Sequence, residues 1–74
     1  MRPISDINIG DQYERGYPFT LTWVIEEVCE TEKMAKIKAY KNGTPLNQPP
    51  FWKKNTDSVF NKRIYNGKTN KVES

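Results

Sequence analysis

Two segments of the chain alternate apolar and polar side chains in the way that half-buried β-strands do. In residues 20–28 every second side chain is large and apolar until Glu26 and Glu27 interrupt the pattern. That interruption predicts a β-bulge, which would return Val28 to the apolar face. Residues 34–40 alternate apolar side chains with lysines, so the two segments are expected to pair as a hairpin whose lysines face solvent.

Shorter patterns predict the remaining strands and turns. Residues 12–15 and 51–54 are expected to form short strands. Pro49 and Pro50 cannot donate ladder hydrogen bonds, so the second of these strands should lie at a sheet edge. The Asn-Gly pair at 42–43 predicts a tight turn, because both residues tolerate a positive φ.

A helical turn should follow the strand at 51–54, with Asn55 or Thr56 as its cap. Phe60 and Ile64 would share the buried face of this turn, because side chains at i and i+4 lie on one side of a helix. A last short strand is expected to begin at Ile64.

The order of these elements is similar to that of the small SH3-like β-barrel proteins of bacteria and bacteriophages. The resemblance is carried by residues 9–13, by the strand at 23–28 and by the strand at 36–40 with its Asn-Gly turn. It implies a mainly β fold, a small SH3-like barrel of about five short strands with one short helix or helical turn near the C-terminus. Proteins of this group bind nucleic acids, peptides or other proteins, so the resemblance implies binding without choosing the partner.

Length and cysteine usage set the domain and the compartment. With 74 residues, the chain is expected to form a single domain over residues 1–66, followed by a frayed polar tail at 67–74. Cys29 is the only cysteine, so neither a disulfide within the chain nor a cysteine-based zinc site can form. We therefore expect a cytoplasmic protein. No apolar run approaches the roughly 20 residues of a membrane span, so no membrane association is expected.

Charge is divided unevenly along the chain, whose net charge is +3. Residues 1–32 carry two arginines against seven carboxylates, whereas residues 33–74 carry ten cations against two carboxylates. Either the two halves interleave in the sheet and neutralise each other, or the second half forms a basic face that attracts an acidic partner.

The residues that most enzymes use for catalysis are largely missing. The chain contains no histidine, which removes the commonest general base and the commonest metal ligand. Glu26 and Glu27 are adjacent in a strand and point to opposite faces, so they cannot act on one substrate without a bulge. Cys29 has no histidine to activate it and is better explained as a small, half-buried residue. We expect a protein without enzymatic activity, without a cofactor and without a metal.

The strongest functional signal lies in residues 50–63, where aromatic rings alternate with cations. Phe51 and Trp52 are adjacent in a strand, so one ring should be core and the other exposed, while Phe60 should be core. With the outward side chains of the strand at 34–40, the exposed ring predicts a basic face that binds nucleic acid or another phosphate-bearing ligand. The residues of this predicted face are Lys36, Lys38, Tyr40, Trp52, Lys53, Lys54, Lys62 and Arg63. The same pattern is also typical of a solvated, lysine-rich surface.

The alternative is a protein-interaction role, as an inhibitor or adaptor of the phage type that docks on a host macromolecule. Aromatic and proline residues in loops are typical interface anchors. The candidate anchors are Tyr17, Phe19, Pro49 and Pro50. The edge strand at 51–54 could also pair with a second copy of itself and produce a homo-oligomer.

Overall fold

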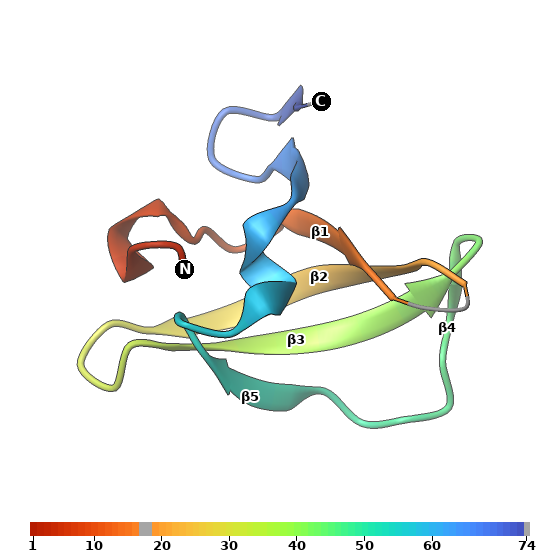
Figure 1. The fold of residues 1–74 in the computed structure, drawn as a ribbon, viewed down its shortest axis with the longest axis horizontal. Helices are drawn as coiled ribbons and strands as arrows, with labels where there is room; N and C mark the ends of the chain where they lie inside the picture. Colours follow the sequence, from red (N-terminus) through yellow and green to blue (C-terminus); the bar gives the residue numbers. More distant parts are fainter. Residues whose placement is uncertain (17–18, 74) are drawn as a thin grey trace.

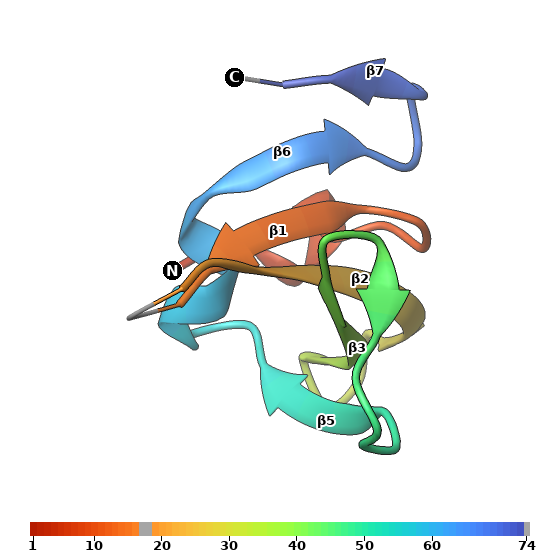
Figure 2. The ribbon, with the colours of Figure 1, turned by 90° about the vertical axis from the view of Figure 1, so that its right-hand side faces the viewer.

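The computed structural model describes residues 1–16 and 19–73, which form a mainly β fold. The elements, in chain order, are η1 (Ile4–Asp6), β1 (Gln12–Arg15), β2 (Leu21–Cys29), β3 (Met34–Lys41), β4 (Thr44–Pro45), β5 (Phe51–Lys54), η2 (Ser58–Asn61), β6 (Arg63–Asn66) and β7 (Lys71–Val72). All strand pairs are antiparallel and form one sheet in the order β4-β3-β2-β1-β6-β7. β5 also pairs with β3, as predicted for an edge strand. Figure 2 shows β7, β6 and β1 one above the other, with β5 at the opposite end of the sheet.

The predicted mainly β class is therefore confirmed, with a helical turn before the last strands. The described residues contain seven strands rather than about five. The two additional strands, β4 and β7, contain only two residues each. Among the described residues β5 pairs with β3 alone. Closure of this sheet into a barrel stays a prediction.

The long hairpin of β2 and β3 follows from the alternation in its two segments. Ile25 pairs with Ile37 and Glu27 pairs with Lys36, so Glu26 is the extra residue of a β-bulge. The bulge was predicted at this place and is confirmed. It turns Val28 back towards the core, against which its side chain packs.

The next turn has the geometry that its Asn-Gly sequence predicts. Asn42 has a φ of 52° and Gly43 a φ of 80°, values that suit the tight turn of a two-residue hairpin. The chain then reverses through β4, in which Thr44 pairs with Lys41.

The core lies on the concave, inner side of the sheet and is closed by η1 and η2 (Figure 1). Its buried members are Ile7, Tyr13, Ile25, Ala35, Ile37, Val59 and Phe60. Phe60 is core, as predicted, and its ring packs edge-on against Tyr13 with centroids 5.3 Å apart. Burying each large apolar side chain of this kind contributes about 1.5–3 kcal/mol.

The helical turn is shorter than the sequence predicted and is capped differently. η2 is a four-residue 3₁₀ helix whose N-cap is Asp57, not Asn55 or Thr56. The Asp57 carboxylate accepts a hydrogen bond of 2.9 Å from the backbone N–H of Val59. Because η2 ends at Asn61, Ile64 lies in β6, and the expected helical pairing of Ile64 with Phe60 is wrong.

The C-terminal segment, for which the sequence predicts a frayed tail, contains a short strand. β7 pairs with β6 through Tyr65 with Val72 and Asn66 with Lys71. The Glu73 carboxylate then reaches back to the Arg63 guanidinium at 2.8 Å. Separately, no helix among residues 1–16 and 19–73 is long and apolar enough to cross a membrane.

Candidate functional site

β5 separates two surfaces of the molecule, because its side chains alternate between the two faces of the sheet. Phe51 and Lys53 lie on the inner face, where the Phe51 ring packs edge-on against Trp23 with centroids 5.9 Å apart. Trp52 and Lys54 lie on the opposite face, and Trp52 is 40% exposed. The prediction that one ring of the adjacent pair is core and the other exposed is confirmed.

The outer face of β3 and β5 carries five of the eight residues of the predicted binding face. Strand register places Lys36 opposite Trp52, and the remaining side chains on this side follow by alternation. We call this surface the outer face, and its residues are Lys36, Lys38, Tyr40, Trp52 and Lys54.

The centre of the outer face is the Trp52 indole with a cation beside it. The Lys36 ammonium lies 6.0 Å from the centroid of the Trp52 ring and 3.1 Å from the Glu27 carboxylate across the hairpin. The Lys54 ammonium donates to the backbone carbonyl of Glu32 at 3.2 Å. The Lys36–Glu27 pair is exposed, so a phosphate could replace the carboxylate at little cost.

A shallow hollow of about 200 Å³ lies beside Trp52, lined by Met34, Cys29 and Glu32. The hydrogen bond between the Cys29 thiol and the Thr31 hydroxyl lowers the pKa of Cys29. The lining gives Trp52 apolar neighbours on one side, which hold the indole against the sheet.

The far end of the outer face is tied to a loop. The Lys38 ammonium donates to the backbone carbonyls of Leu46, at 2.9 Å, and Gln48. Lys38 therefore keeps its charge on the surface while it fixes the chain that leads to β5. Tyr40 pairs with Thr22 across the hairpin and is half-buried.

The other three residues of the predicted face lie elsewhere. Lys53 lies on the inner face, 3.5 Å from the Asp57 carboxylate. Lys62 is exposed beside β1, where its ammonium lies 2.9 Å from the Glu14 carboxylate. Arg63 is buried, its side chain only 7% exposed, because β6 begins at Arg63 instead of continuing a helix.

Arg63 is surrounded by carboxylates. Its guanidinium lies 2.8 Å from Glu73, 3.2 Å from Asp11 and 3.3 Å from Asp6. Burial alone would lower the pKa of Arg63, but the hydrogen bond to Glu73 and the charges of Asp11 and Asp6 raise it above its ordinary value. The Arg63 guanidinium is therefore engaged in contacts that hold β6 to the turn before β1 and to Glu73.

Asp11 is the centre of this network. Its fully buried carboxylate accepts from the backbone N–H of Asn8 (2.9 Å), the hydroxyl of Tyr13 (2.8 Å) and the backbone N–H of Gly67 (2.6 Å). Burial, with the hydrogen bond to Asp11, raises the pKa of Tyr13 above its ordinary value. The network joins the turn before β1 to β6 and its hairpin.

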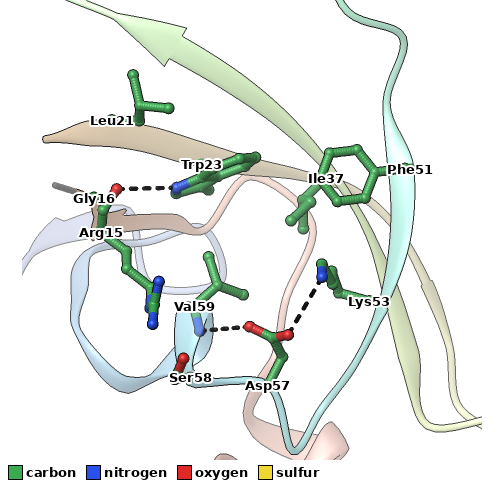
Figure 3. Close-up of a pocket in the computed structure, with 10 residues that line it drawn as sticks. All are labelled: Arg15, Gly16, Leu21, Trp23, Ile37, Phe51, Lys53, Asp57, Ser58 and Val59. Carbon is green, nitrogen blue, oxygen red and sulfur yellow. Dashed lines mark hydrogen bonds and ion pairs between the residues drawn. The ribbon is translucent and has the colours of Figure 1, made fainter. Parts of the chain in front are cut away.

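The inner side of β5 borders a pocket of about 310 Å³ that sequence reasoning missed (Figure 3). Trp23 and Phe51 form one wall, and Val59 of η2 forms the opposite wall. The Arg15 side chain extends from the end of β1 and the Lys53 side chain from β5, on either side of Val59 (Figure 3). The only sign of this pocket in the sequence was the alternation of the strand at 51–54, which places Phe51 and Lys53 on one face.

The predicted protein-interaction residues lie in two loops. Phe19 is 52% exposed, and the Lys41 ammonium lies 4.0 Å from the centroid of its ring. Pro49 is exposed and Pro50 is half-buried. Tyr17 lies outside the described residues.

The acidic and basic halves of the sequence interleave in the structure. Among the described residues, four of the seven ion pairs join an acid from residues 1–32 to a cation from residues 33–74. The basic charge is therefore partly neutralised, and the outer face is one of the places where cations remain at the surface. No group of three or more acidic or cysteine side chains within residues 1–16 and 19–73 has the arrangement of a metal site.

The geometry defines a small, mainly β protein with an aromatic, lysine-bearing outer face and a pocket on the inner side of β5. Comparison with protein families, with curated proteins and with solved structures finds no significant match to this chain.

Proposed function

We propose that the outer face binds single-stranded nucleic acid. The observation that carries this proposal is the Trp52 indole, exposed on an edge strand between Lys36 and Lys54. A nucleobase can stack on such a ring, contributing about 1–3 kcal/mol, while the adjoining phosphates contact the ammonium groups. Lys38 and Tyr40 continue the same combination of charge and ring along β3.

A single strand suits this surface better than a duplex. Bases in a duplex are already stacked on one another, whereas an unpaired base has a free ring face to place on Trp52. The sequence of the ligand would matter little, because every base has a stacking face.

Two further parts of the proposal concern the architecture and the cellular location. The order β5-β3-β2-β1-β6, with η2 directly before β6, supports the small SH3-like architecture. The single cysteine supports a cytoplasmic location.

The test is the affinity for a short labelled single-stranded oligo(dT), measured by fluorescence anisotropy. If Lys36, Lys38 and Lys54 each neutralise one phosphate, affinity should fall about 20-fold between about 50 and 200 mM salt. No binding at the lower salt, or binding that does not change with salt, would contradict the proposal.

Variants locate the binding surface. Trp52→Ala should weaken binding about 5- to 100-fold through loss of stacking. Lys54→Gln should weaken it several-fold and reduce the magnitude of the salt slope by about 0.7. Lys62→Gln is the matched control, because Lys62 is an exposed lysine outside the outer face. Equal effects of the Lys54 and Lys62 variants would show non-specific attraction to net charge.

A protein-interaction role is the second candidate, and the exposed Phe19 ring with Lys41 over it favours it. β5 also has a partner on one side only among the described residues, which leaves an edge for a second copy or another chain. A chain without nucleic-acid affinity but with a stoichiometric protein partner that Phe19→Ala releases would support this role.

A further inference from the structure

The pocket on the inner side of β5 has an apolar wall and a cationic rim. Trp23 and Phe51 present the edge and face of two rings that pack at 85° to each other. Ile37 and Val59 complete the apolar part. Arg15 and Lys53 lie on either side of Val59 (Figure 3), and the Lys53 ammonium is 5.7 Å from the centroid of the Phe51 ring. A ligand that fills the pocket must therefore combine an apolar group with a negative charge.

Hydrogen-bonding groups of the pocket are mostly donors. None of the described residues accepts a hydrogen bond from the Arg15 guanidinium, and the Ser58 hydroxyl lies close by at the start of η2 (Figure 3). Among the acceptors, the Arg15 carbonyl accepts from the Trp23 indole at 3.2 Å. The Asp57 carboxylate accepts from the Val59 N–H and faces Lys53.

Asp57 does not cancel the positive charge of the rim. The hydrogen bond from the Val59 N–H and the charge of Lys53 lower the pKa of Asp57, so its carboxylate stays ionised at neutral pH. Lys53 balances that charge at 3.5 Å. The charge of Arg15 also lowers the pKa of Asp57. Within residues 1–16 and 19–73, however, no carboxylate pairs with the Arg15 guanidinium, whose planar shape suits two parallel hydrogen bonds to a carboxylate.

We infer that this pocket binds a compact apolar carboxylic acid, with its carboxylate on Arg15 and its apolar group against Trp23 and Phe51. A neutral ligand such as a nucleobase fits less well, because it offers no negative charge to the Arg15 guanidinium. The volume of about 310 Å³ is at the lower end for ligand pockets and suits one ring or one branched side chain. Such an acid is either a free small molecule or the last residue of a polypeptide.

The experiment follows the indole N–H resonances of the two tryptophans, assigned with a Trp52→Phe variant. Trp23 reports on the pocket and Trp52 on the outer face, so failure of this inference is distinguishable from failure of the proposed nucleic-acid binding. The probe is 3-phenylpropionate, and the control is the uncharged 3-phenylpropanamide. The acid should shift the Trp23 resonance saturably with a Kd of about 1 mM, as expected for a ligand this small.

Three variants test the contacts. Arg15→Gln should weaken binding of the acid about 10-fold or more, because a charged hydrogen-bond partner is lost. Asp57→Asn keeps an N-cap and should strengthen binding, because it removes the negative charge from the rim. Lys62→Gln should leave the affinity unchanged. Thermal melts establish that each variant is folded before the comparison.

Two peptide probes decide between the sources of the acid. A short peptide ending in Phe with a free carboxylate should bind more tightly than 3-phenylpropionate if the pocket takes a chain end, and less tightly if it takes a free acid. The amidated peptide should not bind in either case. Equal shifts of Trp23 with acid and amide, or no loss of affinity in Arg15→Gln, would overturn the inference.

Discussion

Replacing Arg63 by methionine should remove a large part of the stability of this protein. The side chain is 7% exposed and its guanidinium lies within 3.3 Å of Asp6, Asp11 and Glu73. Methionine is unbranched and apolar and can replace the aliphatic part of the arginine side chain, so the substitution removes mainly the charge and its hydrogen bonds. Asp11, which is fully buried, would lose its ion-pair partner.

The size of the loss in folding free energy follows from the burial of Asp11, the ion-pair partner that remains. Removing one member of a buried ion pair costs about 3–5 kcal/mol, because the other charge stays uncompensated. Asp11 retains the hydrogen bonds from Tyr13 and Gly67, so we expect the lower value, about 3 kcal/mol. A domain of this length has about 4–11 kcal/mol to lose.

Urea unfolding followed by tryptophan fluorescence measures this effect. With a slope of about 1 kcal/mol per molar urea, the midpoint for Arg63→Met should fall by about 3 M. Lys62→Met is the matched control, since its ion pair with Glu14 is exposed and contributes at most about 1 kcal/mol. In a double-mutant cycle, adding Asp11→Asn to Arg63→Met should cost less than Asp11→Asn alone. Equal midpoints for the Lys62 and Arg63 variants would refute the reasoning.

Three further predictions concern the same region. The hydrogen bonds from Arg63 lower the pKa of Glu73. The contribution of Glu73 to folding stability is therefore present above the ordinary pKa of 4.5 and is lost as the pH falls through the lower pKa of the folded state. Glu73→Gln should flatten the acid side of a plot of Tm against pH. Gly67→Ala should destabilise more than Gly43→Ala, as measured by Tm. A Cβ at Gly67 would lie 2.2 Å from the Ile9 carbonyl oxygen, whereas at Gly43 the space is open and only the positive φ of 80° strains an alanine. Burial raises the pKa of Tyr13, so the contribution of the neutral Tyr13 side chain to folding stability is lost as the pH rises through the raised pKa of the folded state. In an alkaline titration one tyrosinate should therefore appear together with unfolding, except in Tyr13→Phe.

The hairpin of β2 and β3 could be predicted because its signals are local. Alternation with period two fixes which side chains share a face, and the interruption at Glu26 marks the bulge within the same strand. The turn at Asn42 also depends only on its own backbone preferences. Each of these features needs information from a few neighbouring residues.

The Asp11 network could not be predicted, because its members are distant in sequence. Arg63 is 52 positions from Asp11 and Gly67 is 56 positions away. Nothing in the alternation of short β1 or β6 reveals that their registers bring these side chains together. The misplacement of Arg63 had a second cause, since it required a helix through residue 63 and η2 ends at Asn61.

The predicted face lies together only in part, because the side chains of β5 alternate between the two faces of the sheet. Sequence reasoning grouped Trp52, Lys53 and Lys54 by their proximity in the chain, but the pleat sends Lys53 to the pocket and the other two to the outer face. The edge-on contact of Phe51 with Trp23 fixes this choice, because a slip of one residue would bury the Trp52 indole and expose Phe51. The two proposed ligands therefore contact opposite faces of β5, the acid at Phe51 and the nucleic acid at Trp52 and Lys54, and each can be tested without removing the other.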